Sequence, residues 1–497
     1  MRTIAHWIGG RPNEGGAAHH GDVTDPATGE VTGRVAFATS AVVDEAVAAA
    51  GAALASWRNV SLSGRTQILF RFRELVDART DDLVRIITSE HGKVGEDARG
   101  EISRGKEVVE FACGIPHLLK GASSENISTK VDSYSIRQPI GVAAGITPFN
   151  FPVMVPMWMH PIAIACGNTF VLKPSEKDPS ASNFVAELWQ EAGLPDGVFN
   201  VVHGDKVAVD AILAHPDIAA VSFVGSTPIA RYVYENGTRA GKRVQALGGA
   251  KNHAMVLPDA DMELAADALT SAAYGSAGER CMAISAVVAV GAAGDVLVEE
   301  LKRRAEDIVV GPGHDASCQM GPLVTEQHRD RVAGYVDAGV AAGAELVVDG
   351  RDLKVEGYEN GFFLGPCLFD NVTTEMSIYT DEIFGPVLIV VRADTFDEGL
   401  AIINRNPYGN GTAIFTNDGG AARMFQNEVN VGMVGVNVPI PVPMAYYSFG
   451  GWKSSLFGDL HVHGMEGVHF YTRGKVMTTR WPDPHHRGID LGFPTSS

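Results

Sequence analysis

The sequence predicts an α/β protein with two helix-covered parallel sheets and a small separate β flap. From residue 141 onward, short apolar strands alternate with helices, which is typical of a parallel sheet with helices on both faces. A second series of the same kind follows over residues 247–444. Two polar-alternating segments, 130–138 and 468–480, lie outside both series and are predicted to pair with each other.

The first third of the chain shows helical patterns and little strand signal. Residues 41–57 are rich in alanine at helical spacing, 63–89 repeat apolar positions with the helical period, and 101–113 continue helically. The segment 130–138 ends at Pro139, as an exposed hairpin strand does. The strands predicted next are 141–146, 169–172, 198–202 and 220–224, and the helices between and after them are 153–165, 179–191, 207–213 and 228–235.

Length and charge narrow the class of protein. A chain of 497 residues favours two or more domains, and its formal net charge of −19 disfavours nucleic acid and anionic membranes as partners. The start of the chain lacks the apolar core of a signal peptide, and no apolar run approaches the ~20 residues that span a bilayer. We therefore expect a soluble, cytoplasmic protein. Five well-separated cysteines without a C-x-x-C pair argue against a disulfide framework and against a metal site.

Two strand ends carry residues suited to a nucleotide. Gly225 and Ser226 follow a predicted strand and precede a helix, whose free N–H groups would suit a pyrophosphate. No G-x-G-x-x-G motif is present, and a plain helix cap is the commoner alternative. Lys173 and Glu176 follow another strand and could bind ribose hydroxyls, with the carboxylate favouring NAD over NADP. The alternative for this loop is an ordinary solvated charged turn.

One cysteine stands in an unusual setting. The stretch GSAGERCMAI, residues 275–284, places Cys281 directly after Arg280 and behind a run of small residues. A neighbouring guanidinium favours the thiolate, which is the reactive form of cysteine. On local grounds alone, a buried and inert cysteine is the commoner alternative.

Five motifs in order carry a resemblance to a known family. They are ITPFNFP (146–152), VLKPSE (171–176), FVGST (223–227), GERCMA (278–283) and DEIFGPV (381–387). Together they resemble the NAD(P)-dependent aldehyde dehydrogenase superfamily over nearly the whole chain. The resemblance implies a Rossmann-like NAD-binding domain from residues 1–121 and 142–246, an α/β catalytic domain from 247–446, and oligomerisation segments at 122–141 and 447–497.

The same resemblance implies roles for individual residues. Cys281 matches the catalytic nucleophile, and Asn150 matches the amide that forms an oxyanion hole with the backbone N–H of Cys281. A thiolate that adds to an aldehyde creates an oxyanion, which needs donors placed in advance. The residues that match cofactor contacts are Phe149, Lys173, Glu176, Gly225, Ser226, Glu382 and Phe384.

One departure from the family pattern bears on the acyl acceptor. Hydrolytic members carry a glutamate that activates water, and in VQALGGAKNH (244–253) its position falls on Leu247. A leucine cannot accept a proton, so the base for water is missing. A thiol such as coenzyme A needs less help, because thiol pKa values lie near ~8.5 and that of water near ~15.7. The alternative is an inactive enzyme.

The departures are similar to those of one branch of the family, the CoA-acylating methylmalonate-semialdehyde dehydrogenases. The similarity lies in GERCMA, in VPMWMHPIAIACGNTF (155–170) and in the long segment 448–473. It implies NAD-dependent oxidative decarboxylation of methylmalonate or malonate semialdehyde, with propanoyl-CoA or acetyl-CoA as product. It also implies that Arg104 and Arg280 bind the substrate carboxylate, since arginine forms two parallel bonds to that group. For Arg104, an exposed helix arginine is the commoner alternative.

Two residues differ from the expected branch pattern, and other functions remain open. His160 stands where an aromatic residue is usual, and Glu279 stands where glutamine is usual and could pair with Arg280. A hydrolytic NAD(P)-dependent semialdehyde dehydrogenase is the nearest alternative. A non-redox cysteine acyl hydrolase or transferase, and a non-catalytic protein that retains the fold, are further ones. The β flap predicts a homo-oligomer, and the resemblance implies a dimer of dimers.

Overall fold

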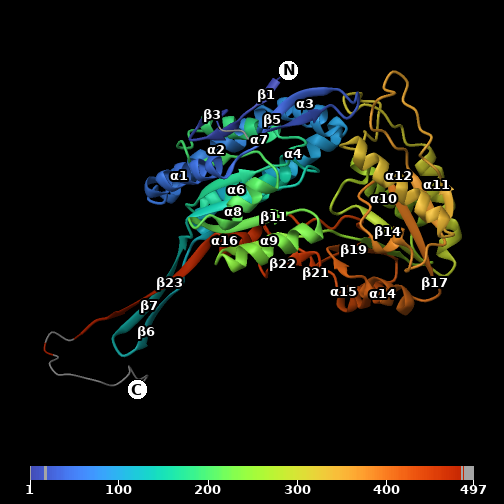
Figure 1. The fold of residues 1–497 in the computed structure, drawn as a ribbon. Helices are drawn as coiled ribbons and strands as arrows, with labels where there is room; N and C mark the ends of the chain where they lie inside the picture. The colour runs from blue at the N-terminus through green and yellow to red at the C-terminus, as the bar shows by residue number, and fades with distance from the viewer. Residues whose placement is uncertain (1, 16–18, 483–484, 486–497) are drawn as a thin grey trace.

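The computed structural model describes residues 2–15, 19–482 and 485, and it contains two large sheets and a projecting flap (Figure 1). The first large sheet has eight strands in the order β22-β12-β11-β8-β9-β10-β2-β3. Its central strands run parallel, as predicted. The strands are β2 (His6–Ile8), β3 (Arg11–Asn13), β8 (Val142–Ile146), β9 (Thr169–Lys173), β10 (Phe199–Val201), β11 (Ile218–Val224), β12 (Arg243–Leu247) and β22 (Leu456–Phe457).

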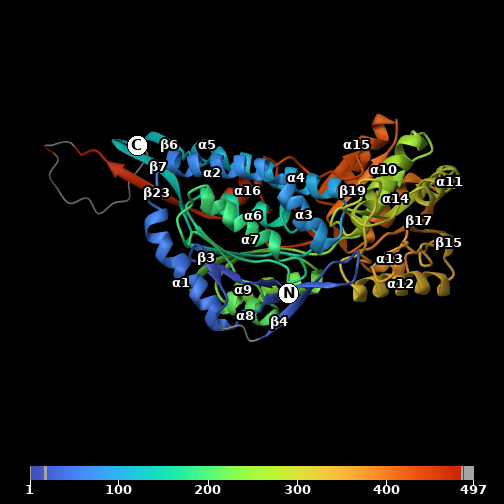
Figure 2. The same cartoon turned by 90° about the horizontal axis from the view of Figure 1, so that it is seen from above.

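Helices cover both faces of this sheet (Figure 2). On one face lie α1 (Ser40–Trp57), α8 (Lys206–Ala214) and α9 (Thr227–Arg239). On the other lie α2 (Leu62–Ala78), α3 (Thr80–His91), α4 (Gly95–Cys113), α6 (Met154–Ala165) and α7 (Ser180–Glu191). The apolar strands are buried from both sides, which confirms the doubly covered sheet.

The second large sheet has seven strands in the order β15-β16-β17-β14-β13-β19-β20. Its strands are β13 (Asn252–Val256), β14 (Ile284–Val290), β15 (Glu345–Val348), β16 (Cys367–Asp370), β17 (Val387–Ala393), β19 (Gly411–Phe415) and β20 (Met433–Val436). The helices around it are α10 (Met262–Tyr274), α11 (Ala293–Glu306), α12 (Glu326–Ala341), α13 (Ser377–Thr380), α14 (Phe396–Arg405) and α15 (Gly419–Glu428). The chain crosses from the first sheet to the second between β12 and β13, next to the predicted boundary at 246/247, which stays a prediction.

The flap projects from the body as a three-stranded antiparallel sheet (Figure 1). It consists of β6 (Ser123–Ser128), β7 (Val131–Pro139) and β23 (Thr472–Arg480). β23 pairs with β7 from Thr472↔Pro139 to Arg480↔Val131, so the predicted pairing of these distant segments is confirmed. The end of the predicted segment 447–497 lies outside the described residues.

Three expectations for individual elements are wrong. Residues 468–470 are not strand but the end of α16 (Gly464–Phe470), because Val468 and Phe470 are buried against the body. The helix expected over 63–89 is two helices that meet at Arg79. The N-terminal region holds strands that the sequence did not signal: β1 (Arg2–Ile4), β2, β3, β4 (His20–Thr24) and β5 (Val31–Ala36). The first three have three residues each, too few for alternation to register.

No helix in the part of the chain that the structure describes combines the length and apolar character needed to cross a bilayer.

Candidate active site

A strained turn precedes Cys281. The short helix η1 (Gly275–Gly278) follows α10 and holds Ser276 and Ala277 at φ 53° and 51°, in the left-handed region. Such backbone costs energy and persists only where the surroundings enforce it. Gly278 follows at φ 73°, and a Cβ there would lie 2.1 Å from the carbonyl oxygen of Gly385. The run of small residues before the cysteine is therefore required by close backbone packing.

Two amides from the second sheet hold the backbone of the cysteine. Asn252 Nδ2 donates to the carbonyl oxygen of Cys281 at 2.9 Å, and Asn410 Nδ2 donates to the same oxygen at 3.1 Å. Asn252 begins β13, and Asn410 immediately precedes β19. The nucleophile thus sits on a loop whose position is fixed by neighbouring strands. Neither contact could be predicted, because the partners are far apart along the chain.

The side chain of Cys281 lies where two cavities meet. One cavity has a volume of about 520 Å³, and the other about 430 Å³. Cys281 lines both of them. A molecule in either cavity therefore has access to the same sulfur atom.

The first cavity gathers seven of the predicted site residues from distant segments. They are Phe149, Asn150, Gly225, Ser226, Cys281, Glu382 and Phe384. Other residues that line this cavity were not predicted, among them His328, Arg331 and Tyr335 on α12, and Tyr408. The three α12 residues recur at helical spacing, which was the one signal that could have found them.

The N-terminus of α9 opens into this cavity. Ser226 occupies the cap position without a side-chain cap bond, which leaves N–H groups of the first turn available to an anion. Glycines keep the walls close: a Cβ on Gly249 would lie 2.3 Å from Glu382 Oε2. The shape and the donors fit a dinucleotide that carries a pyrophosphate.

Glu382 is a buried carboxyl group in the same cavity. Its Oε1 accepts a hydrogen bond from the backbone N–H of Ala250 at 2.8 Å. Burial raises the pKa of Glu382 to about 7, although the Ala250 bond and the nearby Lys251 ammonium oppose the rise. Its charge state therefore changes in the physiological range.

Lys173 and Glu176 lie outside the lining of both cavities. Lys173 Nζ and Glu176 Oε2 form an ion pair at 3.5 Å in the loop after β9. Burial lowers the pKa of Lys173, and Glu176 opposes the change. β9 pairs in register with β8, Ile146 opposite Lys173, so this loop leaves the sheet beside the segment that leads to Phe149. It is at the carboxyl edge of the sheet, where ligands of such folds bind.

The second cavity is largely apolar and contains two arginines. Arg104 and Arg280 line it together with Phe151, Met154, Trp158, Ile440, Val442 and Phe449. Arg104 Nη1 binds the Glu107 carboxylate at 3.0 Å, and Nη2 donates to the carbonyls of Val442 and Pro443 at 3.1 Å. The structure thus brings both predicted carboxylate-binding arginines to one cavity beside the thiol.

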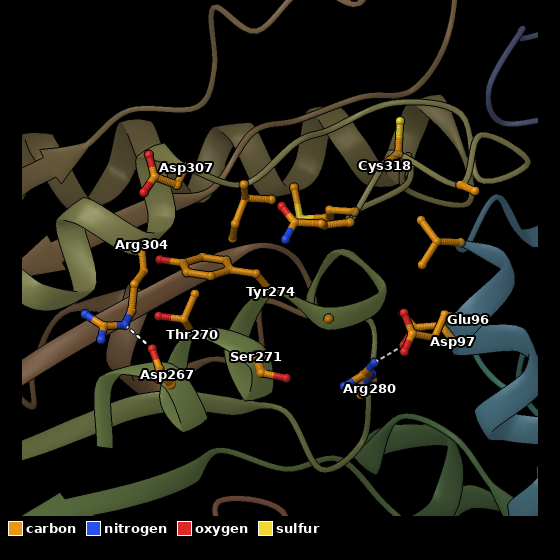
Figure 3. A pocket seen from close by; sticks show the side chains of 16 residues that line it. Glu96, Asp97, Asp267, Thr270, Ser271, Tyr274, Arg280, Arg304, Asp307 and Cys318 are labelled. Carbon is orange, nitrogen blue, oxygen red and sulfur yellow. Dashed lines mark hydrogen bonds and ion pairs between the residues drawn. The ribbon is translucent and has the colours of Figure 1, made fainter. Parts of the chain in front are cut away.

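Arg280 forms an ion pair with Asp97 of α4, which the sequence analysis missed (Figure 3). Its Nε and Nη1 make no hydrogen bond to any residue within the described ranges, so donors remain for a carboxylate. A Cβ on Gly275 would collide with the guanidinium in its present position, so a larger residue there would require the Arg280 side chain to shift. Glu279, expected as a partner of Arg280, points elsewhere, and that expectation is wrong.

A third cavity, of about 570 Å³, lies beyond the Arg280–Asp97 pair (Figure 3). Cys281 is absent from its lining residues, and most of its charged lining residues are acidic: Glu96, Asp97, Asp267 and Asp307. Its second arginine, Arg304, is already bound to Asp267. Although larger than the other two, this cavity does not reach the thiol.

Glu279 and His160, the two residues that differ from the branch pattern, are both buried and contact other side chains of the protein. The fully buried Glu279 lies between His91 and His328, at 3.9 Å and 3.6 Å. Burial raises the pKa of Glu279 and lowers that of His91. His160 is buried among aromatic rings and accepts a hydrogen bond from Trp189 Nε1 at 3.2 Å. It lines none of the cavities that contain Cys281, so a direct effect on substrate choice is not supported.

The thiol of Cys281 is harder to ionise than the sequence suggested. Burial raises its pKa to about 12, and the carboxylate of Glu382 acts in the same direction. Arg280 lowers the pKa as expected, but burial outweighs it. The ligand-free enzyme therefore holds a protonated thiol at neutral pH.

Leu247 stands at the position that corresponds to the water-activating glutamate of hydrolytic family members. Its side chain is buried at the end of β12 and lines neither cavity that contains Cys281. Within the described ranges, four carboxyl groups line those cavities, and each has a partner. Their partners are Arg280 for Asp97, Lys93 for Glu101, Tyr335 for Asp381 and the Ala250 N–H for Glu382.

Comparisons with known proteins agree with this site. The model of the Aldehyde dehydrogenase family matches residues 14–477. A malonate-semialdehyde dehydrogenase of Pseudomonas aeruginosa is 56% identical over 499 residues and is covered completely, as is this chain. The solved methylmalonate-semialdehyde dehydrogenase of Oceanimonas doudoroffii has a TM-score of 0.96 and 54% identity, with 97% of this chain and 99% of that chain covered. A protein of Sinorhizobium meliloti assigned to the same activity, solved with NAD, has a TM-score of 0.97 and 54% identity, with 98% and 99% covered. The chain belongs to the aldehyde dehydrogenase family and has its α/β fold.

Proposed function

We propose that this protein oxidises malonate and methylmalonate semialdehydes with NAD, and transfers the acyl group to coenzyme A with loss of CO₂. The observation that carries the proposal is the position of Cys281. Cys281 lines both the cavity whose residues suit a dinucleotide and the apolar cavity that contains Arg104 and Arg280. Among the described residues, every carboxyl group that lines these two cavities already has a hydrogen-bond or ion-pair partner. The names of the similar proteins support the choice of substrate.

The first cavity suits NAD. Gly225, Ser226 and the α9 N-terminus would hold the pyrophosphate, and Lys173 and Glu176 would hold the adenosine ribose at the adjoining sheet edge. Glu382 and Phe384 would contact the nicotinamide ribose and ring, with Phe149 beside them. When bound, NAD+ supplies the acceptor for the hydride that leaves the aldehyde carbon.

Cys281 carries the substrate through the reaction. Its thiolate adds to the aldehyde carbon, and the resulting oxyanion is stabilised by the Asn150 amide and the backbone N–H of Cys281. Arg104 and Arg280 hold the substrate carboxylate, which fixes the aldehyde next to the sulfur. After oxidation the acyl group remains on Cys281 as a thioester.

The acyl thioester has a carboxylate on its α-carbon. Breaking that carbon–carbon bond releases CO₂ and leaves an enolate, which the Asn150 donor can stabilise and which then takes up a proton. The CoA thiolate attacks the thioester carbonyl, forms acyl-CoA and returns Cys281 as a thiolate. The apolar wall formed by Phe151, Trp158 and Phe449 limits access of water while the acyl group waits.

The carboxylate clamp is tested with Arg104→Leu. We expect KM to rise by about 10- to 100-fold for malonate semialdehyde, because a charge-assisted bidentate contact is lost. For propanal, which has no carboxylate, KM should stay within about threefold of its wild-type value. An equal rise for both aldehydes would show that Arg104 only supports the structure.

A hydrolytic semialdehyde dehydrogenase is the second candidate, and one observation favours it. Glu382 has a pKa of about 7 and lines the same cavity as Cys281, so it could take a proton from water. The two functions differ in whether turnover requires CoA.

The flap and the cysteines support proposals about assembly and location. Tyr134, Ile127 and Val476 expose 46%, 50% and 69% of their surface on the flap, a pattern suited to a second copy of the chain. We infer a homo-oligomer, arranged as a dimer of dimers. All five cysteines are free, as suits the reducing cytoplasm.

A further inference from the structure

A buried ion pair lies directly behind the loop that carries Asn150. Lys93 Nζ contacts Glu101 Oε2 at 2.8 Å, and both side chains have 0% exposure. Lys93 precedes α4, and Glu101 lies within it. Burying two charges is expensive, and an apolar pair of similar volume is often as stable or more so. The pair therefore calls for an explanation other than stability.

Both charged groups also bind the loop between β8 and α6. Lys93 Nζ donates to the carbonyl oxygen of Asn150 at 2.6 Å and lies 4.3 Å from the centre of the Phe151 ring. Glu101 Oε1 accepts from the backbone N–H groups of Val153 and Met154 at 2.7 Å and 3.1 Å. The pair therefore contacts this loop at Asn150 and again where the loop joins α6.

The Glu101 carboxylate substitutes for a cap that α6 lacks. Val153, at the cap position of α6, makes no side-chain cap bond. A carboxylate at this end satisfies orphan N–H groups and favours the helix dipole. Because the carboxylate comes from α4, it also fixes α6 and the preceding loop relative to the helix that carries Arg104.

The loop between β8 and α6 supplies three consecutive residues to the two cavities beside Cys281. Phe149 lines the first cavity, Asn150 lines the same cavity beside Cys281, and Phe151 lines the second cavity. An oxyanion donor works only within about 2.7–3.1 Å of its target. A shift of the loop by about 1 Å would be expected to cost on the order of 100-fold in rate.

We propose that Lys93 and Glu101 are positioning residues for the oxyanion hole. Glu101 also lines the second cavity, but neither group takes part in a bond-forming step of this mechanism. They act by holding the main chain of residues 150–154 so that the Asn150 amide stays aimed at the oxyanion. The inference rests on the proposed function, since it takes Asn150 as the oxyanion donor.

The test is a double-mutant cycle on the first turnover. The rate of the NADH burst is measured for Glu101→Gln and Lys93→Arg, each in the wild-type and the Asn150→Ala background. Both substitutions keep the side chains close in size, and Lys93→Arg keeps the charge. We expect each to slow the burst by about 10- to 100-fold in the wild-type background. In the Asn150→Ala background the further loss should be less than about threefold, because the group being positioned is gone.

Arg65→Met serves as the matched control. Arg65 is a buried cation at the opposite end of α6, where it donates to the carbonyl of Ala165 at 3.1 Å. The substitution should lower the melting temperature and leave the burst rate within about twofold of wild type.

Equal losses in both backgrounds, or an unchanged burst, would overturn the inference, and so would failure of both variants to fold, as a purely architectural pair predicts. If Asn150→Ala itself leaves the burst unchanged, the oxyanion assignment in the proposed function fails instead. A slow Asn150→Ala with a normal Glu101→Gln removes only the positioning role.

Discussion

At the scale of single residues, the site contains two buried groups that can lose a proton, the thiol of Cys281 and the carboxyl group of Glu382. Burial raises the pKa of Cys281 to about 12 and that of Glu382 to about 7. Each group is uncharged at mildly acidic pH, where desolvation makes the charged form costly. Substrate and cofactor must therefore bring the site into its reactive charge state.

The thiol predicts a pH dependence of alkylation. In the ligand-free enzyme, the rate at which iodoacetamide modifies Cys281 should rise by about tenfold per pH unit and show no plateau below about pH 9, because only the thiolate reacts. Mass spectrometry of the tryptic peptide that contains Cys281 reports the rate. A plateau near pH 7 would mean that Arg280 dominates over burial.

Glu382→Gln should stabilise the ligand-free enzyme at high pH only. The folded pKa of about 7 lies above the ordinary value of 4.5, so the folded state holds a proton that the unfolded state releases between these pH values. The contribution of Glu382 to the free energy of unfolding is thus most favourable below pH 4.5 and is lost as the pH rises through 7. Removing the carboxylate should therefore add up to about 3 kcal/mol at pH 8 and nothing at pH 4.

Urea unfolding at the two pH values checks this, and Glu263→Gln at an exposed site serves as the control. The same gain at both pH values would show that charge is not the cause. NAD affinity of the variant should fall, since the ribose contact is lost.

At the scale of elements, one face of α4 lines the second cavity, which we propose binds the substrate. Asp97, Gly100, Glu101 and Arg104 recur at helical spacing and all line it. The sequence predicted the helix and singled out Arg104. The ion pairs of Asp97 with Arg280 and of Glu101 with Lys93 could not be predicted, because these partners meet only in the folded chain.

Gly100 offers a test of this helix face. A Cβ at Gly100 would meet no atom within 4 Å, although the residue lies in mid-helix and lines the cavity. Gly100→Ala should stabilise the protein by about 0.5–1 kcal/mol, because alanine is the better helix former. The added methyl should raise KM several-fold more for methylmalonate than for malonate semialdehyde, by about 3- to 10-fold.

Thermal unfolding and steady-state kinetics measure both effects of Gly100→Ala. Gly51→Ala is the control, since Gly51 lies in α1, also has open space around a Cβ, and lines none of the cavities described above. If KM rises equally for both semialdehydes, this face of α4 does not set substrate size.

At the scale of the whole molecule, the projecting flap predicts association. Val476 exposes 69% of its surface on β23, so Val476→Lys should shift the protein to a smaller oligomer while the far-ultraviolet circular dichroism stays unchanged. Sedimentation velocity measures the assembly. Val207→Lys, at a site 52% exposed on α8, is the matched control. An unchanged oligomer in Val476→Lys would show that the flap is not an interface.

Much of this architecture could be predicted, because strand–helix alternation from residue 141 onward is a local pattern. The pairing of β7 with β23 could also be predicted, since both strands alternate and lie outside the two series. The short N-terminal strands were not predicted, since β1 and β2 pair with strands farther along the chain, β5 and β10. For the site, the resemblance carried by the five motifs indicated Asn150 and Cys281, whereas local grounds alone favoured a buried, inert cysteine. His328, Arg331 and Tyr335 share one face of α12 by their spacing, but the sequence does not show that this face reaches the cavity, because α12 meets it only in the folded chain.

The central claim is that the acyl group on Cys281 leaves to a thiol and not to water. The most direct measurement mixes enzyme, NAD+ and malonate semialdehyde without CoA, and follows NADH and the intact mass of the protein. We predict one rapid equivalent of NADH per protomer, a stall with an acetyl group on Cys281, and renewed turnover to acetyl-CoA when CoA is added. Steady NADH formation and free acetate without CoA would contradict the claim and point to Glu382 as a base for water.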